Sequence, residues 1–143
     1  MLATIGFFAL AVFGLGAVSL LTDADLIAMP GLGPAPGVIG MLSGIVAFAA
    51  MSWSTLRTPH PSFTSAFAIA LVTGLVHLVG IWLAVMIGSG NAVIATAVAG
   101  DFVRGGASVA LLLAAAIAAW GGIALRRTKA AQPRWPWERD EEE

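Results

Sequence analysis

The sequence predicts an all-α fold, a membrane-embedded four-helix bundle, and two observations carry this prediction. The 143-residue chain is 59% hydrophobic and only 10% charged, whereas an ordinary soluble domain has roughly 25% charged residues. The apolar residues also gather into four stretches that can each cross a hydrocarbon core of roughly 30 Å. A soluble domain of this length could not bury so much apolar surface, so lipid is the expected solvent.

The first two spans are expected at about residues 2–21 and 37–53. The first ends at the polar run 22–25. A secretory signal peptide is the alternative for this stretch, but no Lys or Arg precedes it, and it exceeds the usual apolar length of roughly 7–15 residues. The second span follows a segment rich in proline and glycine, residues 29–36, and such residues separate helices.

The third span is expected at 63–87 and the fourth at 106–125, where Arg126 and Arg127 stop it. Residues 91–105 between them are ambiguous. One helix from 91 to 125 would be about 52 Å long, which is too long for one crossing without a large overhang. Gly100 and the pair Gly105–Gly106 are candidate break points. We therefore expect a short interfacial helix at 92–100, with a long, tilted fourth helix as the alternative.

The basic residues predict the orientation. Five of the seven Lys and Arg follow the fourth span, Arg57 lies between the second and third spans, and the loop between the first and second spans has none. The positive-inside rule then places both termini in the cytoplasm. Residues 1–125 form the transmembrane domain, and residues 126–143 form a cytoplasmic tail that is first basic and then acidic. Arg104 remains on the outer side, where its spacing from Asp101 allows the two to pair on one helical face.

Small residues at intervals of four predict close helix packing, because they let backbones approach in lipid. We expect these residues to pack the helices of the four-helix bundle against one another. The alternative is that they mediate homo-oligomerisation or docking onto a larger membrane complex. The second span has Gly40 and Gly44, the third has two such sets, and the fourth has an unbroken stripe: Gly40, Gly44; Ala66, Ala70, Gly74; Gly80, Ala84, Gly88; Ala110, Ala114, Ala118, Gly122.

His77 is the one titratable residue deep in a predicted span. Ionisable residues at such depth usually face the bundle interior and are functional candidates, so His77 is a candidate proton relay or haem ligand. No carboxylate or second His lies at matching depth in the sequence. We therefore expect a structural role, a hydrogen bond to Ser43 on the antiparallel second span, with Thr73 as the fallback partner.

The tail combines a basic start with two tryptophans and an acidic end. Arg126 and Arg127 are expected to lie against anionic headgroups, and Trp135 and Trp137 suit the membrane interface. A docking motif for a cytoplasmic partner is the alternative. The Ala- and Gly-rich spans and the closing segment Arg134–Glu141 resemble small four-span membrane proteins of actinobacteria. These have no assigned activity, so the resemblance implies none.

These observations predict a non-enzymatic membrane component or accessory subunit. The spans offer no nucleophile–base pair, nucleotide loop or metal-ligand cluster, so we expect no catalytic residue, cofactor, metal or nucleic acid partner. The lipid bilayer of the plasma membrane is the expected surrounding. The alternative is a small homo-oligomeric transporter or channel with His77 in its path, and a third possibility, a haem or quinone carrier, depends on His77 alone. Small multidrug exporters carry a Glu in their first span, however, and this chain has no acidic residue before Asp23.

Overall fold

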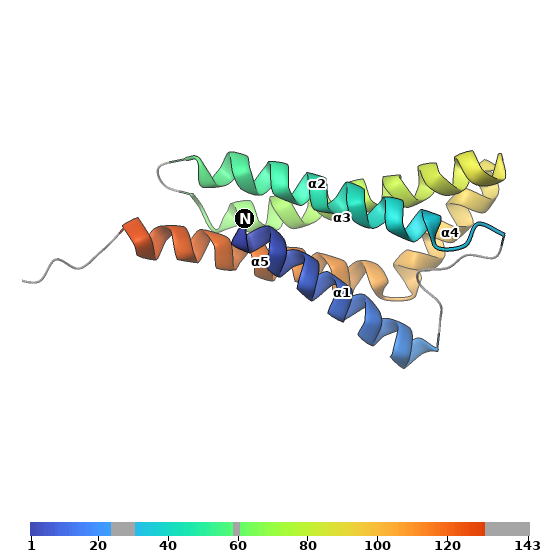
Figure 1. Ribbon diagram of the computed structural model, residues 1–143, viewed down its shortest axis with the longest axis horizontal. Coiled ribbons are helices and arrows are strands. Elements are labelled where there is room, and N and C mark those ends of the chain that lie inside the picture. The colour runs from blue at the N-terminus through green and yellow to red at the C-terminus, as the bar shows by residue number, and fades with distance from the viewer. Residues whose placement is uncertain (24–30, 59–60, 131–143) are drawn as a thin grey trace, which may run out of the picture.

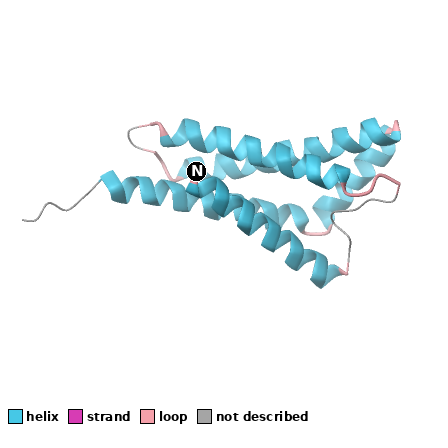
Figure 2. Ribbon diagram, in the orientation of Figure 1, coloured by secondary structure: helices cyan, strands magenta, loops and turns pink. Residues whose placement is uncertain are grey.

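The computed structural model describes residues 1–23, 31–58 and 61–130, and within them it contains five helices and no strand (Figures 1 and 2). The predicted all-α class is therefore confirmed. The helices are α1 (Leu2–Thr22), α2 (Ala35–Leu56), α3 (Thr64–Ser89), α4 (Ala92–Arg104) and α5 (Ala107–Ala130).

The four predicted apolar stretches fall on α1, α2, α3 and α5, which are the described helices long and apolar enough to cross a membrane. The ends of the helices differ by a few residues from the ends of the apolar stretches. Helix α2 begins at Ala35 and includes Pro36 in its first turn, where the missing N–H of proline has no helical partner to lose. Helix α5 continues to Ala130, because Arg and Lys favour helix even though they do not favour lipid.

The long helices run alternately in opposite directions, so both α1 and α3 end at the side of the bundle where α4 lies (Figure 1). We call this side the α4 end, and the opposite side, which holds Met1 and the close of α5, the termini end. Helices α2 and α3 form the most extensive pair, whereas α1 packs mainly on α5 and touches α2 little. Toward the α4 end, α1 diverges from α2.

The core near the termini end is rich in alanine. One buried cluster combines Phe7 of α1 and Phe48 of α2 with residues of α3 and α5, and many of its members are alanines. The two phenyl rings stack, with centroids 4.5 Å apart and planes 13° from parallel. Small side chains bring the backbones close, and the stacked rings fill the space between α1 and α2.

Helix α4 is a separate element, so the alternative of one long fourth helix is wrong. Its start is fixed by Asn91, whose Oδ1 accepts from the backbone N–H of Val93 at 2.9 Å, a typical N-cap. It continues through Gly100 to Arg104, beyond the expected end at residue 100, and the break falls at Gly105–Gly106. Gly106 has a φ of 80°, which L side chains adopt only with strain.

Helix α4 folds back along α3. The Trp82 Nε1–H of α3 donates to Thr96 Oγ1 of α4 at 3.2 Å, and further along α4 the Phe102 ring lies 5.1 Å from the His77 ring. Because the later residue of α4 meets the earlier residue of α3, the two helices are antiparallel. Helix α4 therefore folds back beside the spanning helices α3 and α5, and its glycine joint to α5 is close in sequence to Phe102, the residue that covers His77.

Candidate functional site

His77 packs into a groove on α2 that two glycines form. A methyl group added at Gly40 would lie 3.3 Å from His77 Cε1, and one added at Gly44 would lie 3.5 Å from Nδ1. The side chain is only 2% exposed. The Gly40–Gly44 spacing thus makes room for an imidazole ring, as well as for the close approach of two backbones.

The predicted hydrogen bond between Ser43 and His77 does not form. The Ser43 hydroxyl donates instead to the Gly40 carbonyl at 2.8 Å and to the Val76 carbonyl at 3.3 Å. The Ser43 side chain occupies the space beside Gly80, where a methyl group would collide with it. The partner helix was predicted correctly, but the partner atom was wrong, since depth in the membrane does not fix the rotation of a helix about its axis.

Both ring nitrogens of His77 are buried, and neither makes a hydrogen bond of regular geometry among the described residues, although the Gly40 backbone lies close to the ring. The second predicted bond, from His77 to Thr73, does not form either. The Thr73 hydroxyl is buried without a hydrogen-bond partner among the described residues. A neutral imidazole has one N–H donor and one nitrogen acceptor. Leaving such groups unsatisfied in an apolar core costs free energy, about 1–3 kcal/mol for each.

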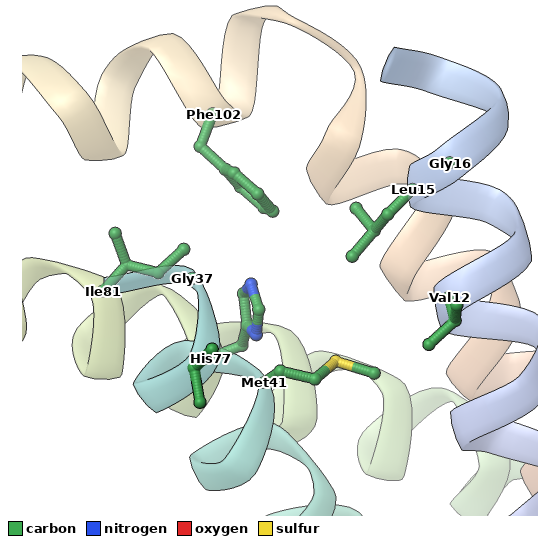
Figure 3. A pocket seen from close by; sticks show the side chains of 9 residues that line it. Val12, Leu15, Gly16, Gly37, Met41, His77, Ile81 and Phe102 are labelled. Atoms are coloured by element: carbon green, nitrogen blue, oxygen red, sulfur yellow. The ribbon is translucent and has the colours of Figure 1, made fainter. Parts of the chain in front are cut away.

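A cavity of about 310 Å³ adjoins this imidazole. Figure 3 shows the ring of His77 at the base of the space, the Phe102 ring directed toward it, and Val12 and Leu15 of α1 on the opposite wall. The lining comes from α1, α2, α3 and α4: Val12, Leu15, Gly16, Gly37, Val38, Met41, His77, Ile81 and Phe102. His77 contributes the polar side chain in an otherwise apolar lining.

The whole chain, residues 1–143, matches the model of a family of unknown function, DUF6121. The chain belongs to the DUF6121 family. No curated protein and no solved structure matches it. This family gives the chain no activity, and the resemblance to actinobacterial proteins stays a prediction.

In this DUF6121 chain the other predicted packing residues face neighbouring helices. A methyl group added at Gly74 would meet Leu112 of α5 at 2.8 Å, and one added at Gly122 would meet Ala3 of α1 at 3.0 Å. Ala110 contacts Gly14 of α1. The remaining members of the stripe on α5 are buried: Ala114 and Ala118. The stripe on α5 therefore lies against α1 within the same chain.

The predicted tail anchors are only partly described. Arg126 and Arg127 are exposed on the last turns of α5, and the Arg127 guanidinium lies 4.8 Å from the centre of the Phe63 ring. On α2, the Arg57 guanidinium lies 4.6 Å from the Trp53 ring centre in the same way. Such cation–π contacts hold the basic groups at the termini end. Trp135 and Trp137 lie outside the described residues.

Sequence reasoning missed Phe102, Met41 and Ile81 as neighbours of His77. The position of Phe102 could not be predicted, because the course of residues 91–105 was ambiguous in the sequence. The residues Trp82 and Thr96 could have indicated this course, because their side chains can hydrogen-bond only if α4 folds back along α3. Ile81 lies four residues after His77, so helical spacing alone places it on the same face. Met41 carried no such signal, because an apolar residue in an apolar span does not indicate its neighbour on another helix.

Proposed function

We propose that this protein is a non-enzymatic component of the plasma membrane that works by binding a small molecule among its helices. One observation supports this proposal. His77 is buried beside a cavity of about 310 Å³, and neither of its ring nitrogens makes a regular hydrogen bond with the described residues. A polar group at such depth is costly and usually serves a function. A bound molecule with a complementary polar group would satisfy it.

The proposed orientation has both termini in the cytoplasm. Three described arginines lie at the termini end: Arg57 at the end of α2, and Arg126 and Arg127 on α5. Arg104 pairs with Asp101 at 3.9 Å beside Phe102, which packs on His77 near the middle of α3, so it does not mark either end of the bundle. The gathering of the other described arginines at one end supports a cytoplasmic termini end.

The test is to extract the protein with its own lipids in polymer nanodiscs and to search for bound small molecules by native mass spectrometry. We expect one species bound beyond bulk phospholipid in the natural protein. Val12→Trp should lose it, because Val12 is half exposed at the wall of the cavity. Val109→Trp is the matched control, since Val109 is similarly exposed on α5 and does not line the cavity.

Equal occupancy in both variants, or no occupant in the natural protein, would overturn the proposal. If the bound molecule has the absorbance spectrum of haem, the spectrum identifies it as haem. Crosslinking and co-purification from the same membranes would show whether the protein is also an accessory subunit of a larger complex or a homo-oligomer.

A second candidate function, a small homo-oligomeric transporter, is favoured by the break at Gly105–Gly106. Transporters often place substrate sites where a membrane helix is discontinuous, and Phe102, just before this break, covers His77. The cavity lining, however, carries no acidic side chain among the described residues, and an ion-coupled carrier normally needs one. A proton or cation flux in proteoliposomes that His77→Leu abolishes would favour transport over binding.

A further inference from the structure

We propose that the His77 cavity binds a neutral, lipid-soluble ring compound that carries a carbonyl or hydroxyl group, of the isoprenoid quinone class. This rests on the proposed function, because it names the ligand of the same site. Charge, hydrogen-bonding capacity, access from lipid and size each support this class of ligand.

The charge of the lining favours a neutral ligand. Apart from His77, the described residues that line the cavity are apolar or glycine. Asp101 and Arg104 flank Phe102 in the sequence, but they pair with each other at 3.9 Å, and their side chains are 77% and 84% exposed. A carboxylate or phosphate head group buried among apolar side chains would lose its hydration without compensation.

The hydrogen-bonding capacity of His77 suits a carbonyl and a hydroxyl equally. One imidazole nitrogen can donate to a quinone carbonyl in one tautomer and accept from a quinol hydroxyl in the other. Nδ1 packs against Gly44 of α2, so Nε2, which makes no regular hydrogen bond among the described residues, is the nitrogen left for a ligand. The same side chain can thus hold the oxidised and the reduced form of one ligand.

Access to the cavity is from the side, through the bilayer. Val12 of α1 and Val38 of α2 both line the cavity, and they are 52% and 49% exposed. Helices α1 and α2 make few contacts with each other, and Figure 1 shows α1 diverging from α2 toward the α4 end. A ligand that diffuses in the membrane reaches such an opening without passing through water.

The size of the cavity fits a head group rather than a whole lipid. A volume of about 310 Å³ is at the low end of the roughly 300–1,000 Å³ of small-molecule sites. It accommodates one ring system while an isoprenoid tail remains in the bilayer. The Phe102 ring, 5.1 Å from the imidazole, offers an aromatic face for a planar ring, and it has to turn for the ligand to reach Nε2.

The experiment uses the full-length protein in nanodiscs of phosphatidylethanolamine and phosphatidylglycerol, with a naphthoquinone bearing one isoprenoid unit as the probe. Imidazole ¹⁵N labelling reports directly on the ligand contact. The chain has two histidines, His60 and His77, so His60→Gln assigns the signals. We expect the His77 signals to shift saturably with the quinone and with its quinol, and the His60 signals to stay unchanged.

Val12→Trp should abolish this shift while the matched control Val109→Trp keeps it. His77→Leu removes the reporter, so its binding is measured with radiolabelled quinone against empty nanodiscs, where we expect a loss of about tenfold in affinity, as for one hydrogen bond. His77→Leu removes the polar nitrogens but changes the shape of a side chain packed in the Gly40–Gly44 groove, so its unfolding temperature is measured alongside. If it does unfold the protein, Val12→Trp still decides.

The outcomes separate the ligand class from the function of the site. A long-chain fatty acid is the charged comparison probe. If the fatty acid moves the His77 signals and the quinone does not, the ligand class is wrong and the binding function stands. If the quinone acts equally on Val12→Trp, it binds elsewhere and the proposal fails. If neither probe binds and native membranes yield no occupant, the proposed function fails as well.

Discussion

Glycine residues on facing helices set how closely α2 and α3 approach. A methyl group added at Gly80 would collide with the Ser43 side chain and would lie 3.3 Å from the Gly40 backbone. The Ser43 hydroxyl also donates to a carbonyl of each of the two helices. The site that holds His77 therefore depends on residues about one turn away along the helices.

Gly80→Ala is expected to destabilise the bundle by about 1–3 kcal/mol, because the added methyl overpacks the α2–α3 contact. Gly121→Ala is the matched control, since nothing lies within 4 Å of a methyl group there. The control should gain about 0.5–1 kcal/mol from helix propensity. Reversible unfolding in detergent micelles measures both variants. Equal stability of the two would contradict the close approach of α2 and α3.

The sequence predicted that His77 would face α2, but not its hydrogen bonding. Which atom a side chain meets depends on the rotation of each helix, and that is set by many small packing contacts. Ser43 shows the difference, since its hydroxyl finds a carbonyl on its own helix at 2.8 Å and needs no imidazole.

Helix α4 is the element that completes the cavity, because it supplies Phe102. Its course depends on the glycine joint, where Gly106 has a φ of 80°. The sequence offered Gly100 and Gly105–Gly106 as break points, and the short helix was expected to end at Gly100. Gly100 continues the helix instead. A glycine can break a helix or sit within it, and only the docking of α4 on α3 decides between the two.

Gly106→Ala is expected to strain this joint by about 1–2 kcal/mol, because an L residue resists a positive φ. No described atom would obstruct the methyl group, so the effect is conformational alone. Gly100→Ala, within helix α4 and equally unobstructed, should be neutral or stabilising. Unfolding temperature and the fluorescence of Trp82, which contacts Thr96, give the comparison, with the other four tryptophans replaced by Phe in both variants. A Gly106→Ala variant as stable as Gly100→Ala would argue against a positive φ at the joint.

At the scale of the whole molecule, the placement of charge predicts the orientation in the membrane. The termini end carries arginines held over aromatic rings, whereas Arg104 lies beside Phe102 and the His77 ring, away from both ends of α3. The chain contains no cysteine. Single cysteines therefore report on topology without a background to remove.

Thr58→Cys, between α2 and α3, should react with a membrane-impermeant maleimide only after cells are permeabilised. Asp25→Cys, between the first and second spans, should react in intact cells. The reverse pattern would show the opposite orientation. Labelling of both positions from outside would contradict a single crossing of the membrane between them.

The separation of the short helix α4 from the spanning helix α5 has a consequence for the order of assembly. Helix α4 has 13 residues, well short of the roughly 20 that a spanning helix needs, so it is not expected to insert by itself. The four long helices can enter the bilayer independently and associate afterwards. Helix α4 then docks onto a bundle that already exists, which makes the covering of His77 the closing step of folding.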